Sequence, residues 1–307
     1  MNSERIEKIA NAVLYEGYLL YPYRASAVKN QQRFNFGVLY PREHCERNPG
    51  SDAWEMQTEC LVRSSPDTTV EIKTRFLQLI ERAERQEGVE REVSTPVFDM
   101  RSLETPLRWR VLFEGAADHG VGRAGTLNAE FELGSSPVTA SLSSIRLRIR
   151  NSAAPGDRRE SRRDEALLHS LVSVHSILQV TGGSFVSLLD PPAEFRKAAA
   201  SCVNIGSWPV LVGEEWQLDM MLSSPIILYD YPQIAPESSG DLFDGTEIDE
   251  ILALRILTLT DAEKLEVRCG DARARRILER TEMLPSEHLQ KLHGAMRGLR
   301  MPDGRVQ

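Results

Sequence analysis

The chain has 307 residues, 41% hydrophobic and 27% charged, and these near-average values argue against a disordered or coiled-coil protein. Its formal net charge of −8 opposes contact with a phosphate backbone, so we expect no nucleic-acid partner. No apolar run approaches the length of about 18 residues that a membrane span needs, and Met1–Lys8 lacks the apolar core of a signal peptide. We therefore expect a cytoplasmic protein without membrane insertion.

Residues 1–150 are predicted to form a β-rich part. Aromatic and aliphatic residues favour strands at Val13–Tyr21 and Arg33–Tyr40, on either side of a polar loop. Alternation of apolar and polar residues predicts further strands at Trp54–Arg63, Thr69–Ile80, Leu107–Glu114, Thr126–Leu133 and Ser144–Arg150. Phe76–Glu84 fits a helix as well as a strand.

The alternation is clearest in Ser144–Arg150. Ile145, Leu147 and Ile149 are expected to face the core. Their neighbours Arg146, Arg148 and Arg150 are expected to face solvent, because successive side chains of a strand point to opposite faces.

Residues 151–164 are rich in arginine and nearly free of large apolar side chains, so they are predicted to be a linker or loop. Residues 165–245 are predicted to form a second β-rich part, with strands at Leu171–Val180, Ser184–Leu189, Trp208–Val212 and Ile226–Tyr229. Thr181-Gly182-Gly183 has the composition of a tight hairpin, although Leu167–Val174 also fits a helix. Glu194–Cys202 is predicted to make one or two helical turns.

Residues 246–307 are predicted to be helical. Thr246 precedes apolar residues at helical spacing, and Thr260 with Glu263 matches a capping box. Gly270 marks a helix end, and Asp271 and Pro285 begin two further helices. The fold class is therefore α+β: antiparallel sheets in a sandwich or barrel, followed by helices. The parts could also form one composite domain.

No common catalytic signature is present: the chain lacks a Walker loop, a dinucleotide-binding glycine motif, HExxH and GxSxG. His44-Cys45 and Cys60 could be metal ligands, but adjacent residues of an extended chain point apart, so we expect no metal site. We also expect no cofactor. Cys202 would need a basic neighbour to act as a nucleophile, and none can be assigned.

The most unusual segment runs from Leu222 to Ser238 and continues through acidic residues to Asp249. Prolines hold such a segment extended, and tyrosines beside carboxylates form either a lid that packs on the fold or a surface that docks a partner. Tyr21, Tyr23, Arg24 and Arg33 form a second cluster of this kind. The candidate contacts in the first segment are Tyr229, Asp230, Tyr231 and Glu237.

Four stretches carry a resemblance to a known family: Leu14–Tyr40, Gly183–Pro192 (GSFVSLLDPP), Asn204–Gly213 (NIGSWPVLVG) and, above all, Leu222–Leu259. They resemble a family of uncharacterised bacterial proteins associated with operons for uptake nickel-iron hydrogenases. The resemblance implies an accessory role in making, assembling or stabilising a hydrogenase. A hydrogenase subunit or a maturation factor would then be the partner.

Two hypotheses follow. The first is a non-enzymatic assembly or scaffold protein that docks another protein through Tyr229–Asp249 and the Tyr21–Arg33 loop. The second is an enzyme whose pocket is built from the distant residues Asp190, Cys202, Asp230 and Glu237. In the second case these side chains must converge in one concave site with perturbed ionisation.

Overall fold

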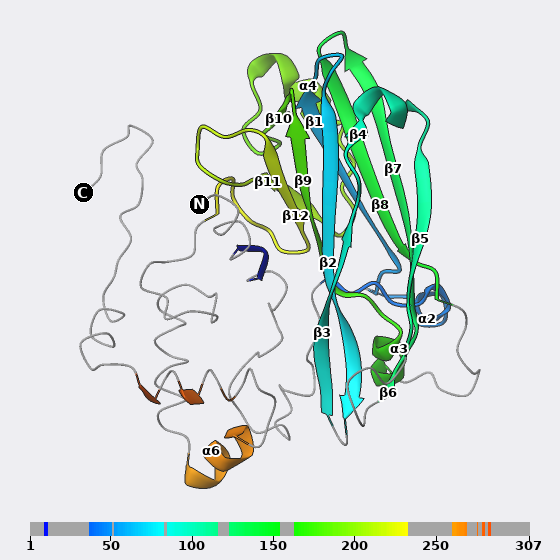
Figure 1. The fold of residues 1–307 in the computed structure, drawn as a ribbon, viewed down its shortest axis with the longest axis vertical. Helices are drawn as coiled ribbons and strands as arrows, with labels where there is room; N and C mark the ends of the chain where they lie inside the picture. The colour runs from blue at the N-terminus through cyan, green and yellow to red at the C-terminus, as the bar shows by residue number, and fades with distance from the viewer. Residues whose placement is uncertain are drawn as a thin grey trace. The chain divides into compact units, whose positions relative to one another are not determined.

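A computed structural model describes residues 9–11, 37–50, 52–82, 85–115, 123–153, 163–232 and 260–268, with single residues 275, 278, 279, 282 and 283. The chain divides into two compact units: residues 1–17 with 34–232, and residues 18–33 with 233–307. Each unit is described by itself. The first is a sandwich of two antiparallel sheets (Figure 1), which confirms the predicted β-rich α+β fold class.

Five strands form sheet B and seven form sheet C. In spatial order, sheet B consists of β10 (Ser184–Val186), β1 (Glu55–Arg63), β8 (Leu142–Asn151), β7 (Leu127–Thr139) and β5 (Leu107–Phe113). Sheet C consists of β11 (Trp208–Leu211), β12 (Met220–Ser224), β9 (Val172–Thr181), β2 (Thr69–Arg82) and β3 (Arg85–Ser94), with the short strands β4 (Phe98–Asp99) and β6 (Arg123–Ala124) also paired to β2.

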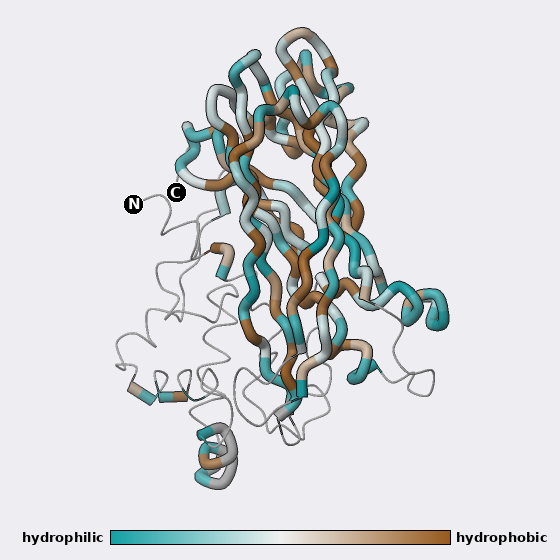
Figure 2. Tube along the Cα trace, turned by 45° about the vertical axis from the view of Figure 1, so that its right-hand side comes forward, coloured by the Kyte–Doolittle hydropathy of each residue, from teal (hydrophilic) through white to brown (hydrophobic). Residues whose placement is uncertain are grey.

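The core lies between the two sheets, and along β8 buried residues largely alternate with less buried ones. Phe131 on β7, Ile145 on β8 and Phe76 on β2 are almost completely inaccessible to solvent and belong to one cluster. Figure 2 shows the same period as hydrophobic and hydrophilic residues alternating along the strands. The strands predicted at Trp54–Arg63, Thr69–Ile80 and Ser144–Arg150 are confirmed as β1, β2 and β8.

A pair of hydroxyl groups links the sheets inside this core. Thr58 Oγ1 on β1 lies 2.5 Å from Ser223 Oγ on β12, and Ser207 Oγ donates to the Gln57 carbonyl at 2.7 Å. A backbone hydrogen bond also joins the sheets where β10 ends sheet B: the Phe185 amide donates to the Leu218 carbonyl, just before β12, at 2.6 Å. Buried polar groups need such partners, so these contacts fix how the two sheets meet.

Short helices occupy the connections between strands. Asp99 caps a 3₁₀ turn by accepting a hydrogen bond from the Arg101 amide at 2.8 Å. The predicted turns at Glu194–Cys202 are confirmed as η3 followed by α4. The short helices are α2 (Arg42–Arg47), η2 (Met100–Glu104), α3 (Arg163–Leu168), η3 (Ala193–Phe195) and α4 (Arg196–Ala200).

Residues on both sides of the predicted linker at 151–164 contribute to the same two sheets. β9 lies between β12 and β2, and β10 pairs with β1. The predicted hairpin at Thr181–Gly183 is therefore wrong, because the chain crosses here from sheet C to sheet B instead of pairing with itself. Gly182 still provides the expected left-handed turn, with φ of +72°.

Three other expectations need correction or completion. Ile226–Tyr229 is not a strand: Ser224 Oγ accepts from the Ile226 amide at 3.3 Å and donates to its carbonyl at 2.7 Å, which turns the chain away after β12. Phe76–Arg82 continues β2 and is not helical. The strands β3 and β12 were missing from the sequence prediction because charged residues and a methionine pair hide their alternation.

The predicted strand Arg33–Tyr40 is described only from Gly37 onward. There it is reduced to a single bridge residue, Leu39, which pairs with both Ala53 and Leu171. Gly37 has φ of +54° and accepts a hydrogen bond from the Val174 amide at 3.0 Å. It also packs so closely on Pro225 that an added Cβ would lie 2.5 Å from Pro225 Cγ.

The second unit is described at α6 (Asp261–Arg268) and at a few residues beyond it. The helix begins directly after Thr260, as predicted, and the Thr260 carbonyl accepts the Lys264 amide at 2.8 Å. Lys264 and Arg268 both bind Glu282, at 3.1 and 2.9 Å. The predicted helix at Thr246 and the helix end at Gly270 lie outside the described residues.

The outer face of sheet C buries a histidine. His175 on β9 stands opposite Arg75 on β2, and both are buried, with Arg75 Nη2 donating to Asn11 Oδ1 at 2.8 Å. His175 Nδ1 donates to the Ser173 carbonyl at 2.9 Å, within a bulge where Ser173 has φ of +56°, while Nε2 has no partner among the described residues. Burial, with a smaller contribution from Arg75, lowers the pKa of His175 to about 4.

His175 should therefore make the fold acid-sensitive. The unfolded chain takes up a proton on this histidine below about pH 6.5, whereas the folded chain does so only near pH 4. As the pH is lowered from about 6.5 to about 4, the free energy of unfolding should therefore fall by about 1.4 kcal/mol per pH unit, or about 3 kcal/mol in all. Urea unfolding of the wild type and of His175→Gln at a series of pH values measures it. A stability difference between the two that does not change with pH would contradict this expectation.

Candidate functional site

The Ile226–Tyr231 segment is the first candidate site, and its end is fixed to the edge strand β11. Asp230 Oδ1 accepts the Leu211 amide at 2.8 Å, and Asp230 Oδ2 accepts Ser187 Oγ at 2.6 Å. The Tyr231 amide donates to the Leu211 carbonyl at 2.7 Å, and its hydroxyl donates to the Gln217 carbonyl at 3.2 Å. Burial and the neighbouring Asp230 raise the pKa of Tyr231. Asp230 and Tyr231 thus act as anchors.

The middle of the same segment projects into solvent. Ile227 is 71% exposed and Tyr229 is 86% exposed. Other large apolar side chains are exposed on β11 and on the chain connections that adjoin β10, β11 and β12: Leu189, Val203, Ile205, Trp208, Trp216 and Leu218. Exposed apolar side chains held by a rigid edge are typical of surfaces that bind proteins.

The remaining predicted contacts cannot be placed with this segment. Tyr21, Tyr23, Arg24, Arg33 and Glu237 lie outside the described residues. Their grouping with Tyr229 stays a prediction.

Two members of the alternative pocket lie near one another, and a third has different surroundings. The Asp190 amide donates to Ser187 Oγ at 2.9 Å, and the same hydroxyl donates to Asp230. Cys202 instead follows α4, where its thiol contacts the Ala198 carbonyl and packs on a separate apolar cluster. Burial, followed by the charge of Glu59, raises the pKa of Cys202 to about 11, which keeps the thiol protonated and unreactive.

The other described cysteines are similarly unreactive, and His44 is engaged by its neighbours. Burial raises the pKa of Cys45 to about 11 and raises that of the core residue Cys60 further. His44 stacks on Tyr40 and lies 3.3 Å from Asp52. Within the described part of the chain, no three histidine, cysteine, aspartate or glutamate side chains lie close enough to hold a metal ion.

The second candidate site is an array of charges on the outer face of sheet B, which we call the arginine–glutamate ladder. The strand register places acidic and basic residues opposite one another in four adjacent columns. The columns are Glu55 and Glu59 on β1, Arg146, Arg148 and Arg150 on β8, Glu130 and Glu132 on β7, and Arg108 and Arg110 on β5.

Glu132 is at the centre of the ladder, with a side chain only 11% exposed. It accepts Arg108 Nε at 2.7 Å and lies 3.6 Å from Arg148 Nη1 and 3.8 Å from Arg150 Nη1. Glu130 accepts Arg110 and Arg150, and the hydrogen bond from Arg110 is the main reason that its pKa is lowered. Such a network orients its members more firmly than isolated surface pairs do.

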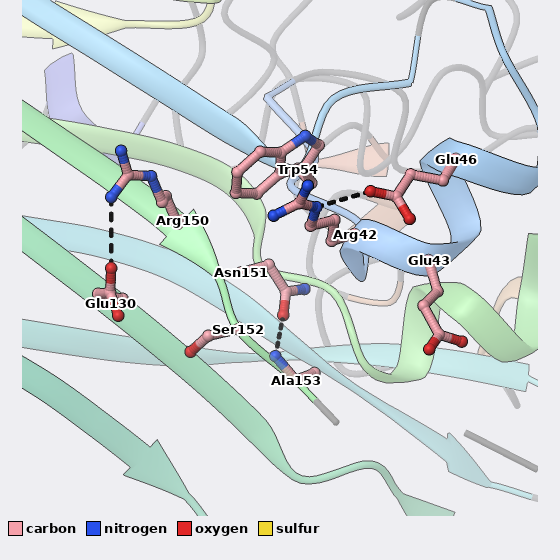
Figure 3. Close-up of a pocket in the computed structure, with 9 residues that line it drawn as sticks. All are labelled: Arg42, Glu43, Glu46, Trp54, Glu130, Arg150, Asn151, Ser152 and Ala153. Atoms are coloured by element: carbon pink, nitrogen blue, oxygen red, sulfur yellow. Dashed lines mark hydrogen bonds and ion pairs between the residues drawn. The ribbon is translucent and has the colours of Figure 1, made fainter. Parts of the chain in front are cut away.

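A pocket of about 530 Å³ opens where the ladder meets α2 (Figure 3). Arg42 lies over the Trp54 ring at 4.8 Å and binds Glu46 at 2.7 Å. On the opposite wall, Glu130 binds Arg150 at 3.3 Å. The other lining residues are Glu43, Asn151, Ser152 and Ala153. The polar side chains of this pocket already have partners within the protein, so it has no evident unmet group that would select a ligand.

Only one column of the ladder was predicted from the sequence. The outward arginines Arg146, Arg148 and Arg150 were recognised, but their acidic partners were not. The available signal was the spacing of two in Glu130-Phe131-Glu132, which matches the spacing of the arginines with the opposite sign. Only the strand order shows that the columns are neighbours.

Removing the central carboxylate should destabilise the sandwich. Glu132→Gln leaves three arginines close together without a full negative charge, so we expect the free energy of unfolding to fall by about 1–3 kcal/mol. Arg108→Gln is the matched control, because Arg108 is 68% exposed and its loss should cost less than about 1 kcal/mol. Urea titration measures both, and equal effects would contradict the central role of Glu132.

Cys202 should resist alkylation. With a pKa of about 11, its thiolate fraction at pH 8 is about a hundredfold below that of an exposed cysteine. We expect iodoacetamide to modify Cys202 far more slowly than glutathione, as followed by mass spectrometry in a Cys269→Ser background. Faster modification than glutathione would indicate an activated nucleophile and would revive the enzyme hypothesis.

Comparison with known proteins adds no relative. A scan against protein-family models finds no match, and a search of curated proteins finds no similar chain. Among the described helices, none is long and apolar enough to cross a membrane. The candidate sites therefore rest on this chain's own structure. They are the Ile226–Tyr231 segment and the arginine–glutamate ladder.

Proposed function

We propose that this chain is a non-enzymatic accessory protein that binds another protein through the Ile226–Tyr231 segment. One observation carries the proposal. The segment is bonded to β11 through Asp230 and Tyr231, while Ile227 and Tyr229 extend into solvent. A fixed backbone lowers the entropy lost on binding, because the exposed side chains are already displayed before the partner arrives.

The chemistry of the displayed side chains supports a protein partner. Tyrosine is enriched among interface residues that dominate binding energy, since it buries a large apolar ring and keeps one hydrogen-bonding group. Trp208, at the start of β11, is 49% exposed and is the cross-strand partner of Ser224, close to where the segment begins. Tyr229 and Trp208 together give an interface two aromatic anchors.

The roles of Asp230 and Cys202 agree with a binding protein better than with a catalyst. Asp230 uses both carboxylate oxygens to hold β11 and Ser187 in place. The thiol of Cys202 is kept protonated by burial. Asp230 and Cys202, two of the four residues of the alternative pocket, thus support the fold.

The nature of the partner rests on the family resemblance. Proteins encoded with uptake nickel-iron hydrogenases are expected to act on the assembly or stability of the enzyme, so we propose a hydrogenase subunit or a maturation factor as the partner. Titration of the full chain against the purified large subunit, small subunit and maturation factors, each separately, tests this directly. Absence of binding to all of them would overturn the hydrogenase assignment.

Replacing the displayed side chains should weaken partner binding strongly without unfolding the chain. For Ile227→Ala/Tyr229→Ala we expect affinity for the partner to fall about 30-fold or more, the effect of an interface hot spot. Stability should change by less than about 0.5 kcal/mol, because both side chains are largely exposed. Calorimetric titration and urea unfolding measure the two effects.

Val97→Ala/Val138→Ala is the matched control. These valines are 62% and 45% exposed and lie outside the Ile226–Tyr231 segment, so their loss should leave binding unchanged. Equal affinity of the wild type and the Ile227→Ala/Tyr229→Ala variant would contradict the proposed surface.

A further inference from the structure

Strand β5 is an edge of sheet B whose outer side has no partner strand among the described residues. It pairs with β7 along its whole length, from Leu107 to Phe113, and is interrupted by neither proline nor bulge. In an antiparallel strand, every second residue directs its N–H and C=O toward the unpaired side. Such an edge is a template for another strand unless something blocks it.

The two edges of sheet C, β11 and β3, differ from β5 in ways that disfavour such an added strand. On β11, Pro209 lacks an N–H, and Asp230 and Tyr231 occupy the backbone of Leu211. On β3, the acidic side chains of Glu90 and Glu92 face Arg75 and Lys73 of the neighbouring strand, so an added acidic strand would meet like charges there. A proline and an occupied backbone, as on β11, are typical of natural edge protection.

The arginine–glutamate ladder indicates what kind of strand β5 would accept. Its columns alternate in sign from acidic β1 to basic β8, acidic β7 and basic β5. Arg108 and Arg110, in the last column, bind Glu132 and Glu130 on one side but remain 68% and 69% exposed. The next column in this order is acidic, because opposite charges stabilise directly paired positions.

The face of β5 that packs on the core determines which residues an added strand needs between its acidic positions. Trp109, Val111 and Phe113 are partly buried and pack against the core. Trp109 stacks on Phe131 with ring centroids 5.1 Å apart, and Phe113 meets Phe76 edge-on at 5.4 Å. A strand added beside them would extend this apolar surface, so its residues between the acidic positions should be apolar.

We propose that β5 is a docking edge for an extended acidic segment of a partner protein, which adds to sheet B as its sixth strand. The segment alternates glutamate or aspartate with apolar residues, so that its carboxylates meet Arg108 and Arg110 while its backbone pairs with β5. A second copy of β5 fits less well, since antiparallel pairing centred on Trp109 or Arg110 sets arginine against arginine. The site is separate from the Ile226–Tyr231 segment and does not depend on the function proposed for it.

A labelled peptide tests the proposal on the full chain. The probe alternates glutamate with valine over about seven residues, a usual strand length, and fluorescence anisotropy reports its binding. The control probe has the same composition with its glutamates in one block. We expect the alternating peptide to bind at least about tenfold more tightly than the control. Equal affinities, or no binding at about 1 mM, would overturn the proposal.

Variants of the protein locate the site. Arg108→Gln/Arg110→Gln should weaken binding of the alternating peptide about tenfold, because two charge pairs are lost. Arg63→Gln/Arg123→Gln removes the same charge from two arginines that are 50% and 58% exposed outside β5, and should leave binding unchanged. Equal loss in both variants would show a general charge effect and would overturn docking at β5. Urea unfolding confirms that each variant is folded.

N-methylation of the peptide separates strand pairing from charge attraction. A peptide added to the edge turns the N–H groups of alternate residues toward β5 and the others toward solvent. Methylating one alternate set should abolish binding, while methylating the other should preserve it. Equal tolerance of both sets would contradict pairing with the strand.

Discussion

Charge pairing across the outer face of sheet B holds four strands in one register. Arg148 and Arg150 of β8 stand between acidic or amide side chains of β1 and β7, and Arg146 stands opposite Glu59 of β1 and Gly134 of β7. The inward residues of the same strand fill the core. A slip of one residue would bring Arg146, Arg148 and Arg150 into the apolar interior, at a cost of several kcal/mol for each unpaired charge. The pattern of charges and the pattern of burial therefore specify the same pairing.

The two sides of the sandwich differ in how their edge strands are covered. One side is closed where β10, β11 and β12 meet, by the hydrogen bond of Phe185 and by the Ile226–Tyr231 segment. The opposite side ends in β5, with two exposed arginines and, in the part of the chain that the structure describes, no further strand paired to it. The two proposed binding surfaces lie on different strands, so both could be occupied at the same time.

Local alternation was enough to predict most of the strands. Trp54–Arg63, Leu107–Glu114 and Ser144–Arg150 repeat apolar residues every second position, and burial between two sheets demands that spacing. The crossing from β9 to β10 was not predictable in this way, because a Gly-Gly turn serves a hairpin and a sheet-to-sheet crossing equally well. Ile226–Tyr229 has the composition of a strand, yet the Ser224 turn and the Asp230 anchor keep it out of the sheet.

The candidate sites were predictable to a lesser degree. The sequence indicated Tyr229, Asp230 and Tyr231 as one interacting group, whereas the structure divides them into an exposed ring and two anchors. The ladder depends on strand order, which no local pattern encodes. Its acidic and basic members are separated by up to 95 residues in the chain, as Arg150 and Glu55 show.

Gly37 couples two distant parts of the first unit by occupying a space that no other residue fits. Its carbonyl accepts the Val174 amide beside the bulge of β9, and its Cα faces the ring of Pro225, from which the Ile226–Tyr231 segment departs. Any larger residue at position 37 would adopt a disfavoured backbone conformation and push the proline ring outward. The direction in which the Ile226–Tyr231 segment leaves β12 thus depends on the absence of a side chain at residue 37, almost two hundred positions earlier in the chain.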